Sequence, residues 1–285
     1  MKLNCPANCP TDPLLLQVLP IHLEFEEQPD AYSEDPVGDL DAMPIPGLLH
    51  KYHGRVLLIT TPACAIHCRY CFRRHYPYQD AHYRPEFWQD ALNYIQSDET
   101  IEEVILSGGD PLSLSNQRLT GLLEQLATIN HLKRLRIHSR FPVVLPERVD
   151  VELLTLLTSS HLQTVMVIHC NHAQELDHEV IKGLQRITAT GIRILNQAVL
   201  LKGINDDVHV LKHLSESLFE AGVLPYYLHQ LDKVSGAAHF AVPAEQAIEF
   251  ERELRQLLPG YLVPRLVIEQ AGKPSKLPLG EFPAQ

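Results

Sequence analysis

Beyond residue 50, short apolar runs alternate along the chain with longer stretches in which apolar and polar residues recur at helical spacing. Runs rich in Val, Ile and Leu are typical of buried strands, and the amphipathic stretches are typical of helices. The predicted strands are Arg55–Thr60, Glu103–Ser107, Leu135–Ser139, Gln163–His169, Ile192–Ala198 and Val223–His229. The predicted helices are Pro85–Ser97, Ser115–Thr128, Asp150–Ser159, Asp177–Thr190, Val208–Ala221 and Pro243–Leu258, followed by an apolar run, Tyr261–Ile268.

This alternation of strands and helices predicts a parallel sheet, because successive parallel strands need a crossover connection between them. Six such units in one domain favour an α/β fold of the barrel kind, and we predict a partial (β/α)6 TIM-like barrel. A doubly wound sheet is the alternative that the pattern leaves open.

Residues 1–50 do not share this pattern, because prolines interrupt every apolar run. We therefore predict an irregular, Pro-rich N-terminal extension over residues 1–50 and a barrel domain over residues 51–285. The prolines are Pro6, Pro10, Pro13, Pro20, Pro29, Pro36, Pro44 and Pro46.

Polar residues gather where the predicted strands end. In parallel α/β folds the C-terminal ends of the strands line the active site, so these residues predict one catalytic pocket. The strand ends read Ser107-Gly-Gly-Asp110, His138-Ser-Arg140, His169-Cys-Asn-His172, Asn196-Gln197 and His229-Gln-Leu-Asp232.

Composition narrows the class of protein. A length of 285 residues suits one large domain, and 45% hydrophobic with 21% charged residues is typical of a folded globular protein. The formal net charge of −11 disfavours nucleic acid as a partner. No apolar stretch is long enough to cross a bilayer and no apolar signal region precedes Pro6, so we expect a cytoplasmic protein that does not bind a membrane.

Against this acidic background, the run from His67 to His75 holds three arginines, Arg69, Arg73 and Arg74. Such a local basic cluster indicates a site for a small anion such as a carboxylate or a phosphate. Taken alone, the cluster is better explained by a solvated basic turn.

The chain has six cysteines, and three of them follow the first predicted strand as Cys64-Ala-Ile-His-Cys68-Arg-Tyr-Cys71. Three thiolates at this spacing indicate a [4Fe–4S] cluster whose fourth iron is open to a substrate. The alternative is a zinc site completed by His67 or His75. We expect no ligand role for the remaining cysteines: Cys5 and Cys9 lie in the Pro-rich segment, and Cys170 suits a buried position.

The cysteine motif resembles that of the radical S-adenosylmethionine (SAM) superfamily, and further motifs resemble the lysine 2,3-aminomutases. The resemblance runs from about Asp12 to Pro278 and is strongest to the branch that makes β-lysine for modification of elongation factor P. It rests on His50-Lys-Tyr52, Arg55-Val-Leu-Leu-Ile-Thr60, Cys71-Phe-Arg73-Arg74, Leu106-Ser-Gly-Gly-Asp-Pro111, Asn196-Gln197, Leu200-Leu-Lys-Gly-Ile-Asn-Asp206 and Pro225-Tyr-Tyr227.

The resemblance implies a radical SAM type of barrel with three cofactors: a [4Fe–4S] cluster, SAM and pyridoxal 5′-phosphate in a C-terminal binding segment. The family's Schiff-base lysine falls on Lys276 rather than on nearby Lys273. The resemblance implies a phosphate-binding group made of Lys51, Tyr52 and Arg55. The motif that holds the amino end of SAM in the family is matched by Gly108, Gly109 and Asp110. The same pocket is expected to be lined by Ser139, Arg140 and His169.

The resemblance also implies L-lysine as the substrate. Arg73 matches the residue that pairs with the substrate carboxylate, whereas Asp232 and Glu269 match the two acidic positions that hold the ε-ammonium. Glu269 replaces an Asp of the lysine-degrading relatives, which changes the shape of that site. Two carboxylates favour a cationic end group and disfavour an acidic one.

We therefore expect an isomerase, an L-lysine 2,3-aminomutase whose β-lysine serves elongation factor P and its lysyl ligase. Its expected electron donor is of the flavodoxin or ferredoxin type. The sequence leaves open whether the protein forms a homo-oligomer. The alternatives are a 2,3-aminomutase acting on arginine or glutamate, a radical SAM enzyme without pyridoxal phosphate, and a non-catalytic iron–sulfur or zinc module.

Overall fold

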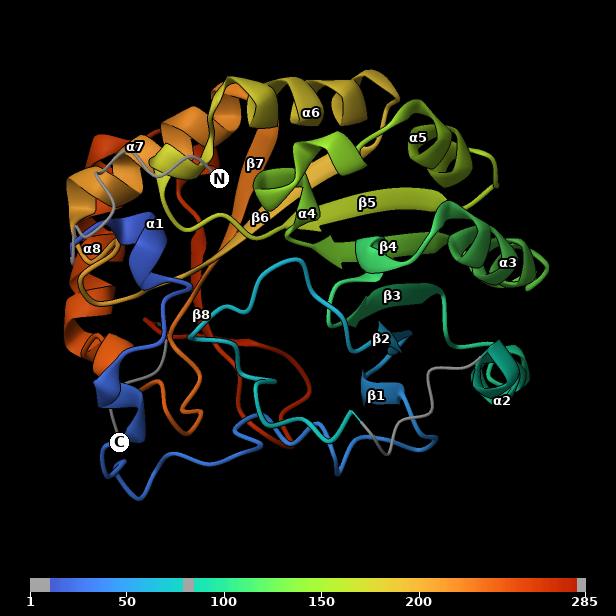
Figure 1. Cartoon of the computed structure of the whole chain (residues 1–285), viewed down its shortest axis with the longest axis horizontal. Coiled ribbons are helices and arrows are strands. Elements are labelled where there is room, and N and C mark those ends of the chain that lie inside the picture. The colour runs from blue at the N-terminus through green and yellow to red at the C-terminus, as the bar shows by residue number, and fades with distance from the viewer. Residues whose placement is uncertain (1–10, 79–84, 281–285) are drawn as a thin grey trace.

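The structure, a computed structural model, describes residues 11–78 and 85–280, and in these residues one curved sheet holds nine strands in chain order (Figure 1). The seven central strands are parallel, whereas the first and last are antiparallel to their neighbours. The strands are β1 (Leu48–Tyr52), β2 (Arg55–Thr61), β3 (Glu103–Gly108), β4 (Arg134–Ser139), β5 (Gln163–Ile168), β6 (Arg193–Val199), β7 (Val223–His229), β8 (Arg265–Ile268) and β9 (Leu277–Pro278).

The helices cover the convex face of the sheet, and Figure 1 shows them as an outer arc around the strands. This arrangement confirms the partial barrel and excludes the doubly wound alternative, which needs helices on both faces. The helices of the described residues are α1 (Pro13–Leu16), α2 (Pro85–Ser97), α3 (Asn116–Ala127), α4 (Phe141–Val144), α5 (Val151–Thr158), α6 (His178–Ala189), α7 (Val208–Glu220) and α8 (Ala244–Leu257).

Side chains that cap backbone N–H groups fix where several of these helices begin. Asp150 accepts a hydrogen bond of 2.7 Å from Leu153 N at the start of α5, and Ser115 and Asp177 cap α3 and α6 in the same way. The six predicted strands and six predicted helices are confirmed to within about two residues at their ends, and the apolar run after α8 contributes β8.

Alternation along the strands separates the core from the concave face. In β4, Leu135 and Ile137 are buried against the helices, whereas Arg136 and His138 line a cavity on the opposite face. The core between sheet and helices includes Val104, Leu106, Met166, Ile168, Ile194, Leu119, Leu122, Leu153, Leu184, Leu214 and Leu254.

The N-terminal segment, as far as it is described, crosses the open side of the sheet before it enters β1 (Figure 1). Strand β1 was not predicted, and it runs across the boundary that we placed between residues 50 and 51. That boundary stays a prediction. None of the helices in residues 11–78 and 85–280 is long and apolar enough to span a bilayer.

Candidate active site

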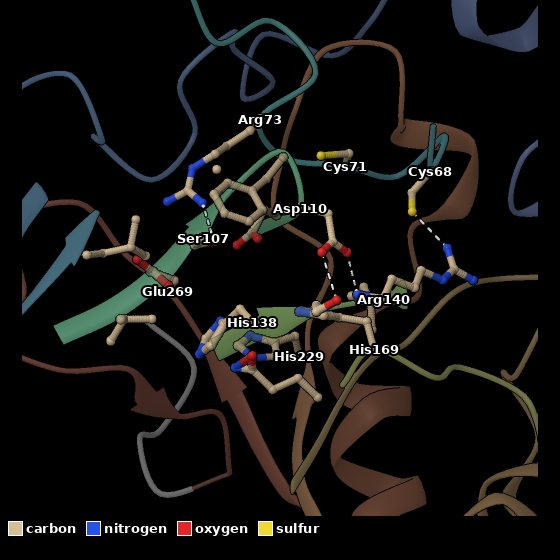
Figure 2. Close-up of a pocket in the computed structure, with 18 of the residues that line it drawn as sticks. Cys68, Cys71, Arg73, Ser107, Asp110, His138, Arg140, His169, His229 and Glu269 are labelled. Atoms are coloured by element: carbon tan, nitrogen blue, oxygen red, sulfur yellow. Dashed lines mark hydrogen bonds between the residues drawn. The ribbon is translucent and has the colours of Figure 1, made fainter. Parts of the chain in front are cut away.

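A cavity of about 420 Å³ opens on the concave face of the sheet, at the C-terminal ends of the parallel strands. Figure 2 shows Glu269 on one side of this cavity, Cys68 and Arg140 on the other, and His138 and His229 at its base. The structure brings together every residue to which the sequence analysis gave a cofactor or substrate role. These are Lys51, Tyr52, Arg55, Cys64, Cys68, Cys71, Arg73, Gly108, Gly109, Asp110, Ser139, Arg140, His169, Asp232, Glu269 and Lys276. By contrast, the strand-end residues Asn171, His172 and Asn196 do not line the cavity.

The three cysteines lie on the loop that follows β2, and their thiols are free. Among residues 11–78 and 85–280, no three His, Cys, Asp or Glu side chains form a ready-made site for one metal ion. Nε2 of His75 lies 3.0 Å from the carbonyl oxygen of Ser235, which leaves Nδ1 as the ring nitrogen with which His75 could complete a zinc site. Cys170 is buried as expected, and Cys5 and Cys9 lie outside the described residues.

The two glycines after β3 allow a close approach to the cysteine loop. A Cβ atom on Gly109 would lie 2.4 Å from the carbonyl oxygen of Ala63, and Gly108 has a φ of +122° that disfavours other residues. The N–H groups of Gly109 and Asp110 donate to Thr61 and Ala63. The glycine motif therefore fixes the position from which the cysteine loop departs.

The Asp110 carboxylate is saturated by protein donors in this structure. It accepts from Ser139 Oγ at 2.7 Å, from Arg140 N at 2.7 Å and from Leu112 N at 3.0 Å (Figure 2). Burial raises the pKa of Asp110 to about 6, although these hydrogen bonds oppose the rise. Its contacts organise the strand ends, and the amino-binding role implied by the resemblance stays a prediction.

A row of alternating charges crosses the other side of the cavity. Arg73 Nε donates to Asp39 Oδ2 at 2.6 Å, and Lys51 Nζ lies 2.5 Å from Asp39 Oδ1. Lys51 also pairs with Glu269 Oε1 at 3.2 Å, and Lys276 pairs with the other oxygen of Glu269. Asp39, which the sequence analysis missed, thus links two predicted cationic ligands.

The two predicted ammonium ligands differ in their surroundings. Burial alone would raise the pKa of Glu269, but Lys276 and Lys51 lower it to about 2. Burial and the charge of Glu269 raise the pKa of Asp232 to about 7. Oδ1 of Asp232 is buried without a hydrogen-bond partner in the described residues. A cation entering the cavity would therefore find an unused carboxylate oxygen at Asp232.

The predicted phosphate-binding residues are partly engaged with one another. Lys51 donates to the carbonyl of Val37 at 2.8 Å besides its two carboxylates. The Arg55 guanidinium lies 4.7 Å from the ring centre of Tyr52, and within residues 11–78 and 85–280 no carboxylate is paired with it. Of this group, Arg55 is thus the cation with capacity for an added phosphate.

Three histidines with neutral imidazoles line the base of the cavity. Burial, followed by the charges of Arg140 and Lys276, lowers the pKa of His169 to about 4, and burial lowers the pKa values of His138 and His229 well below the usual range. Nε2 of His138 is buried without a partner in the described residues. The sequence analysis placed His138 and His229 at strand ends that predict one pocket but gave neither of them a role.

The basic cluster does not serve one anion as a unit. Arg69 and Arg74 both pair with Glu24, which is buried in the N-terminal segment. The anion that these two arginines bind is thus a carboxylate of the chain itself. Arg73 alone of the three reaches the cavity.

Comparison with known proteins identifies the family. Residues 58–214 match the Radical SAM superfamily. Over 267 residues, 94% of this chain and 79% of the relative, the chain is 49% identical to L-lysine 2,3-aminomutase of Haemophilus influenzae. It is 48% identical to L-lysine 2,3-aminomutase of Escherichia coli over 270 residues, 95% of this chain and 78% of the relative. The chain belongs to the L-lysine 2,3-aminomutase family. This membership implies a [4Fe–4S] cluster and SAM as cofactors.

Solved structures agree with this family in fold. Streptococcus suis SuiB bound to S-adenosylmethionine superposes with a TM-score of 0.57 at 15% identity, over 77% of this chain and 51% of SuiB. A radical SAM methyltransferase from Sphaerobacter thermophilus gives a TM-score of 0.52 at 17% identity, over 78% of this chain and 68% of that protein. At these identities the likeness concerns the fold alone.

The residues of the cavity fit the cofactors of this family. The free thiols of Cys64, Cys68 and Cys71 line this cavity and would supply three ligands for a cluster. Lys276 lines the same cavity, and among the described residues Arg55 has no paired carboxylate and Nε2 of His138 has no hydrogen-bond partner, so that an amine, a cation and a ring nitrogen are available for a phosphorylated aldehyde.

Proposed function

We propose that this protein is an L-lysine 2,3-aminomutase, an isomerase that converts L-α-lysine to β-lysine in the cytoplasm. The observation that carries the proposal is the cation site formed by Asp232 and Glu269 in the same cavity as the three cluster cysteines. Glu269 already holds the ε-ammonium of a lysine, that of Lys276, and Asp232 offers an unused oxygen beside it. The family relationship supports the same substrate.

The chain's own residues position the substrate at its two ends. Arg73 would bind the α-carboxylate and Asp232 with Glu269 the ε-ammonium, so that the length of the chain between them sets which carbon faces the radical. A misplaced carbon would react elsewhere or not at all, so positioning is the main task of this site. The cluster and SAM, when bound, would supply the radical chemistry that takes a hydrogen atom from C3, with one electron from a flavodoxin- or ferredoxin-type donor.

Pyridoxal 5′-phosphate is the third cofactor of this proposal, and it would carry the nitrogen that migrates from C2 to C3. Lys276 would bond to its aldehyde carbon and Arg55 would bind its phosphate. Lys276 cannot bind the aldehyde and pair with Glu269 at the same time. Once Nζ is bonded to an aldehyde, it no longer donates to Glu269 as a free ammonium. The carboxylate of Glu269 would then be available to the ε-ammonium of an entering substrate, whose α-amino group would afterwards replace Lys276 on the aldehyde carbon and release it as an amine.

Anaerobic reconstitution tests the proposal directly. Purified protein is loaded with iron, sulfide and pyridoxal phosphate, reduced, and incubated with SAM and L-lysine, and β-lysine is measured by mass spectrometry. We expect both an iron–sulfur absorbance and a pyridoxal absorbance, and β-lysine only when SAM is present. SAM cleavage without a pyridoxal band would instead favour a radical enzyme of another class. Absence of SAM cleavage would favour a non-catalytic module.

We further propose that the β-lysine is passed to a ligase that attaches it to elongation factor P. This step rests on the motif resemblance to that branch of the family. Intact mass spectrometry of elongation factor P from a deletion strain is the test. Loss of the β-lysyl mass is expected, and its persistence at the full level would contradict the proposal.

A further inference from the structure

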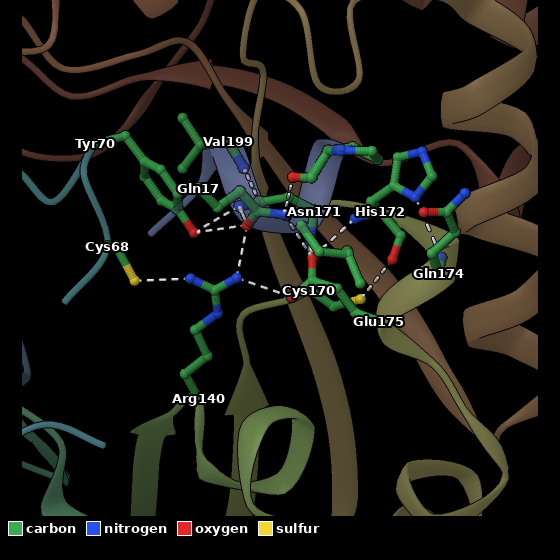
Figure 3. Close-up of polar contacts among 12 residues, drawn as sticks. Gln17, Cys68, Tyr70, Arg140, Cys170, Asn171, His172, Gln174, Glu175 and Val199 are labelled. Carbon is green, nitrogen blue, oxygen red and sulfur yellow. Dashed lines mark hydrogen bonds and ion pairs between the residues drawn. The ribbon is translucent and has the colours of Figure 1, made fainter. Parts of the chain in front are cut away.

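The guanidinium of Arg140 is buried between the cysteine loop and the N-terminal segment (Figure 3). Nη1 donates to Cys68 Sγ at 2.7 Å, and Nη2 donates to Gln17 Oε1 at 2.6 Å and to Glu175 Oε2 at 2.8 Å. Arg140 therefore reaches a predicted cluster ligand with one nitrogen while two acceptors hold the other. Gln17, the first of these two acceptors, lies 123 residues before Arg140 in the sequence.

Gln17 is held rigidly in this position. Its side chain is fully buried, its Nε2 donates to Glu175 Oε1 at 3.2 Å, and its backbone carbonyl accepts from Arg69 N at 2.8 Å. Asp12 caps the preceding helix α1 through Leu14 N and Leu15 N. The amide of Gln17 thus has its place set by both its side chain and its backbone.

The same amide oxygen gathers two further donors. Asn171 Nδ2 lies 3.0 Å from Gln17 Oε1 and 2.6 Å from the hydroxyl of Tyr70, and the Tyr70 hydroxyl lies 3.4 Å from Gln17 Oε1. Figure 3 shows Gln17 and Asn171 on one side of the Arg140 guanidinium, and the Cys68 sulfur with the Tyr70 ring on the other. Fixing one edge of a planar guanidinium fixes the direction in which its opposite nitrogen points.

We propose that Gln17 is a positioning residue that holds Arg140 so that Nη1 donates a hydrogen bond to the sulfur of Cys68. The inference rests on the proposed function in one respect, namely that Cys68 ligates the cluster. A hydrogen bond from a cation withdraws electron density from a thiolate ligand and raises the reduction potential of an iron–sulfur cluster. Gln17 thereby favours the one-electron reduction with which the reaction begins.

The test is the midpoint potential of the reconstituted cluster in Gln17→Met, measured by spectroscopic redox titration without SAM. Met preserves the volume of the side chain, and each former partner keeps another bond: Arg140 keeps Glu175, and Asn171 keeps Tyr70. We expect the ratio of reduced to oxidised cluster to fall about tenfold at a fixed applied potential, which is a shift of about 59 mV to more negative values for a one-electron couple.

The matched control is Gln125→Met on the exposed face of α3, which should leave the potential unchanged. Should Gln17→Met fail to fold, Gln17→Asn keeps the amide but withdraws it by one methylene, and the same negative shift is expected. An unchanged potential in a folded, cluster-bearing Gln17 variant would overturn the inference while leaving lysine turnover by the parent protein intact. A parent protein that assembles no cluster would overturn both.

Discussion

Nε of Arg73 donates a hydrogen bond of 2.6 Å to Oδ2 of Asp39. The guanidinium that we assign to the substrate carboxylate is therefore already oriented by a carboxylate of the N-terminal segment. Ser107 Oγ accepts from Nη1 at 3.3 Å, and in the part of the chain that the structure describes no hydrogen bond engages Nη2, which is thus the donor available to a ligand. Asp39 thus determines which edge of Arg73 faces the cavity.

This relationship predicts that Asp39→Asn weakens lysine binding. Loss of one partner of a buried ion pair costs about 2–5 kcal/mol, so we expect the KM for lysine to rise at least tenfold. The iron–sulfur absorbance should stay at the parent level. Asp41→Asn, at an exposed carboxylate two residues away, is the control. Equal KM values in the two variants would contradict the orienting role of Asp39.

The raised pKa of Asp232 predicts a pH dependence of substrate binding. With a pKa of about 7 this carboxyl is largely protonated at pH 6 and ionised at pH 8, and only the ionised form attracts an ammonium. The KM for lysine should therefore fall between pH 6 and pH 8, and Asp232→Asn should abolish this fall and most of the turnover. A parent-like pH profile in that variant would remove Asp232 from the ammonium site.

Substrate choice follows from the same carboxylates. Glutamate should be a poor substrate because its distal carboxylate would face Asp232 and Glu269, whereas arginine offers a suitable cation on a longer side chain. We expect turnover in the order lysine, arginine, glutamate when the three are compared at equal concentration. If glutamate were the best of them, neither acidic residue could hold the role assigned to it.

Lys276 is expected to carry the pyridoxal phosphate. Borohydride reduction of the loaded protein, followed by peptide mass spectrometry, should place the pyridoxyl group on Lys276, which lines the cavity. Lys273 is exposed and provides the internal control within the same peptide region. A label on Lys273 would refute the assignment and leave the class of enzyme unaffected.

The cysteine loop predicts three indispensable thiols. Alanine in place of Cys64, Cys68 or Cys71 removes one iron ligand, so each single variant should lose the iron–sulfur absorbance of the reconstituted protein. Cys5→Ala and Cys9→Ala are the controls and should retain it. Loss of absorbance in these controls would show that our exclusion of the two N-terminal cysteines is wrong.

The sequence predicted those parts of the site that depend on local pattern. Period-two alternation in β4 places Arg136 and His138 opposite Leu135 and Ile137, and the same rule places the other strand ends around one cavity. The spacing of the three cysteines is likewise local, and the family motifs added the residues for the cofactors and the substrate.

The contacts made by the N-terminal segment were beyond this kind of reasoning. Asp39 meets Arg73 over 34 positions, Glu24 meets Arg69 over 45, and Gln17 meets Arg140 over 123. Neither hydrophobic periodicity nor helix capping relates residues so far apart in sequence. An irregular segment has no regular face from which its neighbours could be predicted. The carboxylates that neutralise the basic cluster therefore became visible only in three dimensions.

The pairing of Lys276 with Glu269 gives the proposed enzyme an order of assembly. While the ammonium of Lys276 pairs with Glu269, this carboxylate is occupied by the protein's own side chain, and free lysine would have to compete with Lys276 for it. Under the proposed function, attachment of Lys276 to the cofactor would end that competition. Glu269 would thus turn to the substrate only after the cofactor is attached, so that cofactor loading would precede full substrate binding.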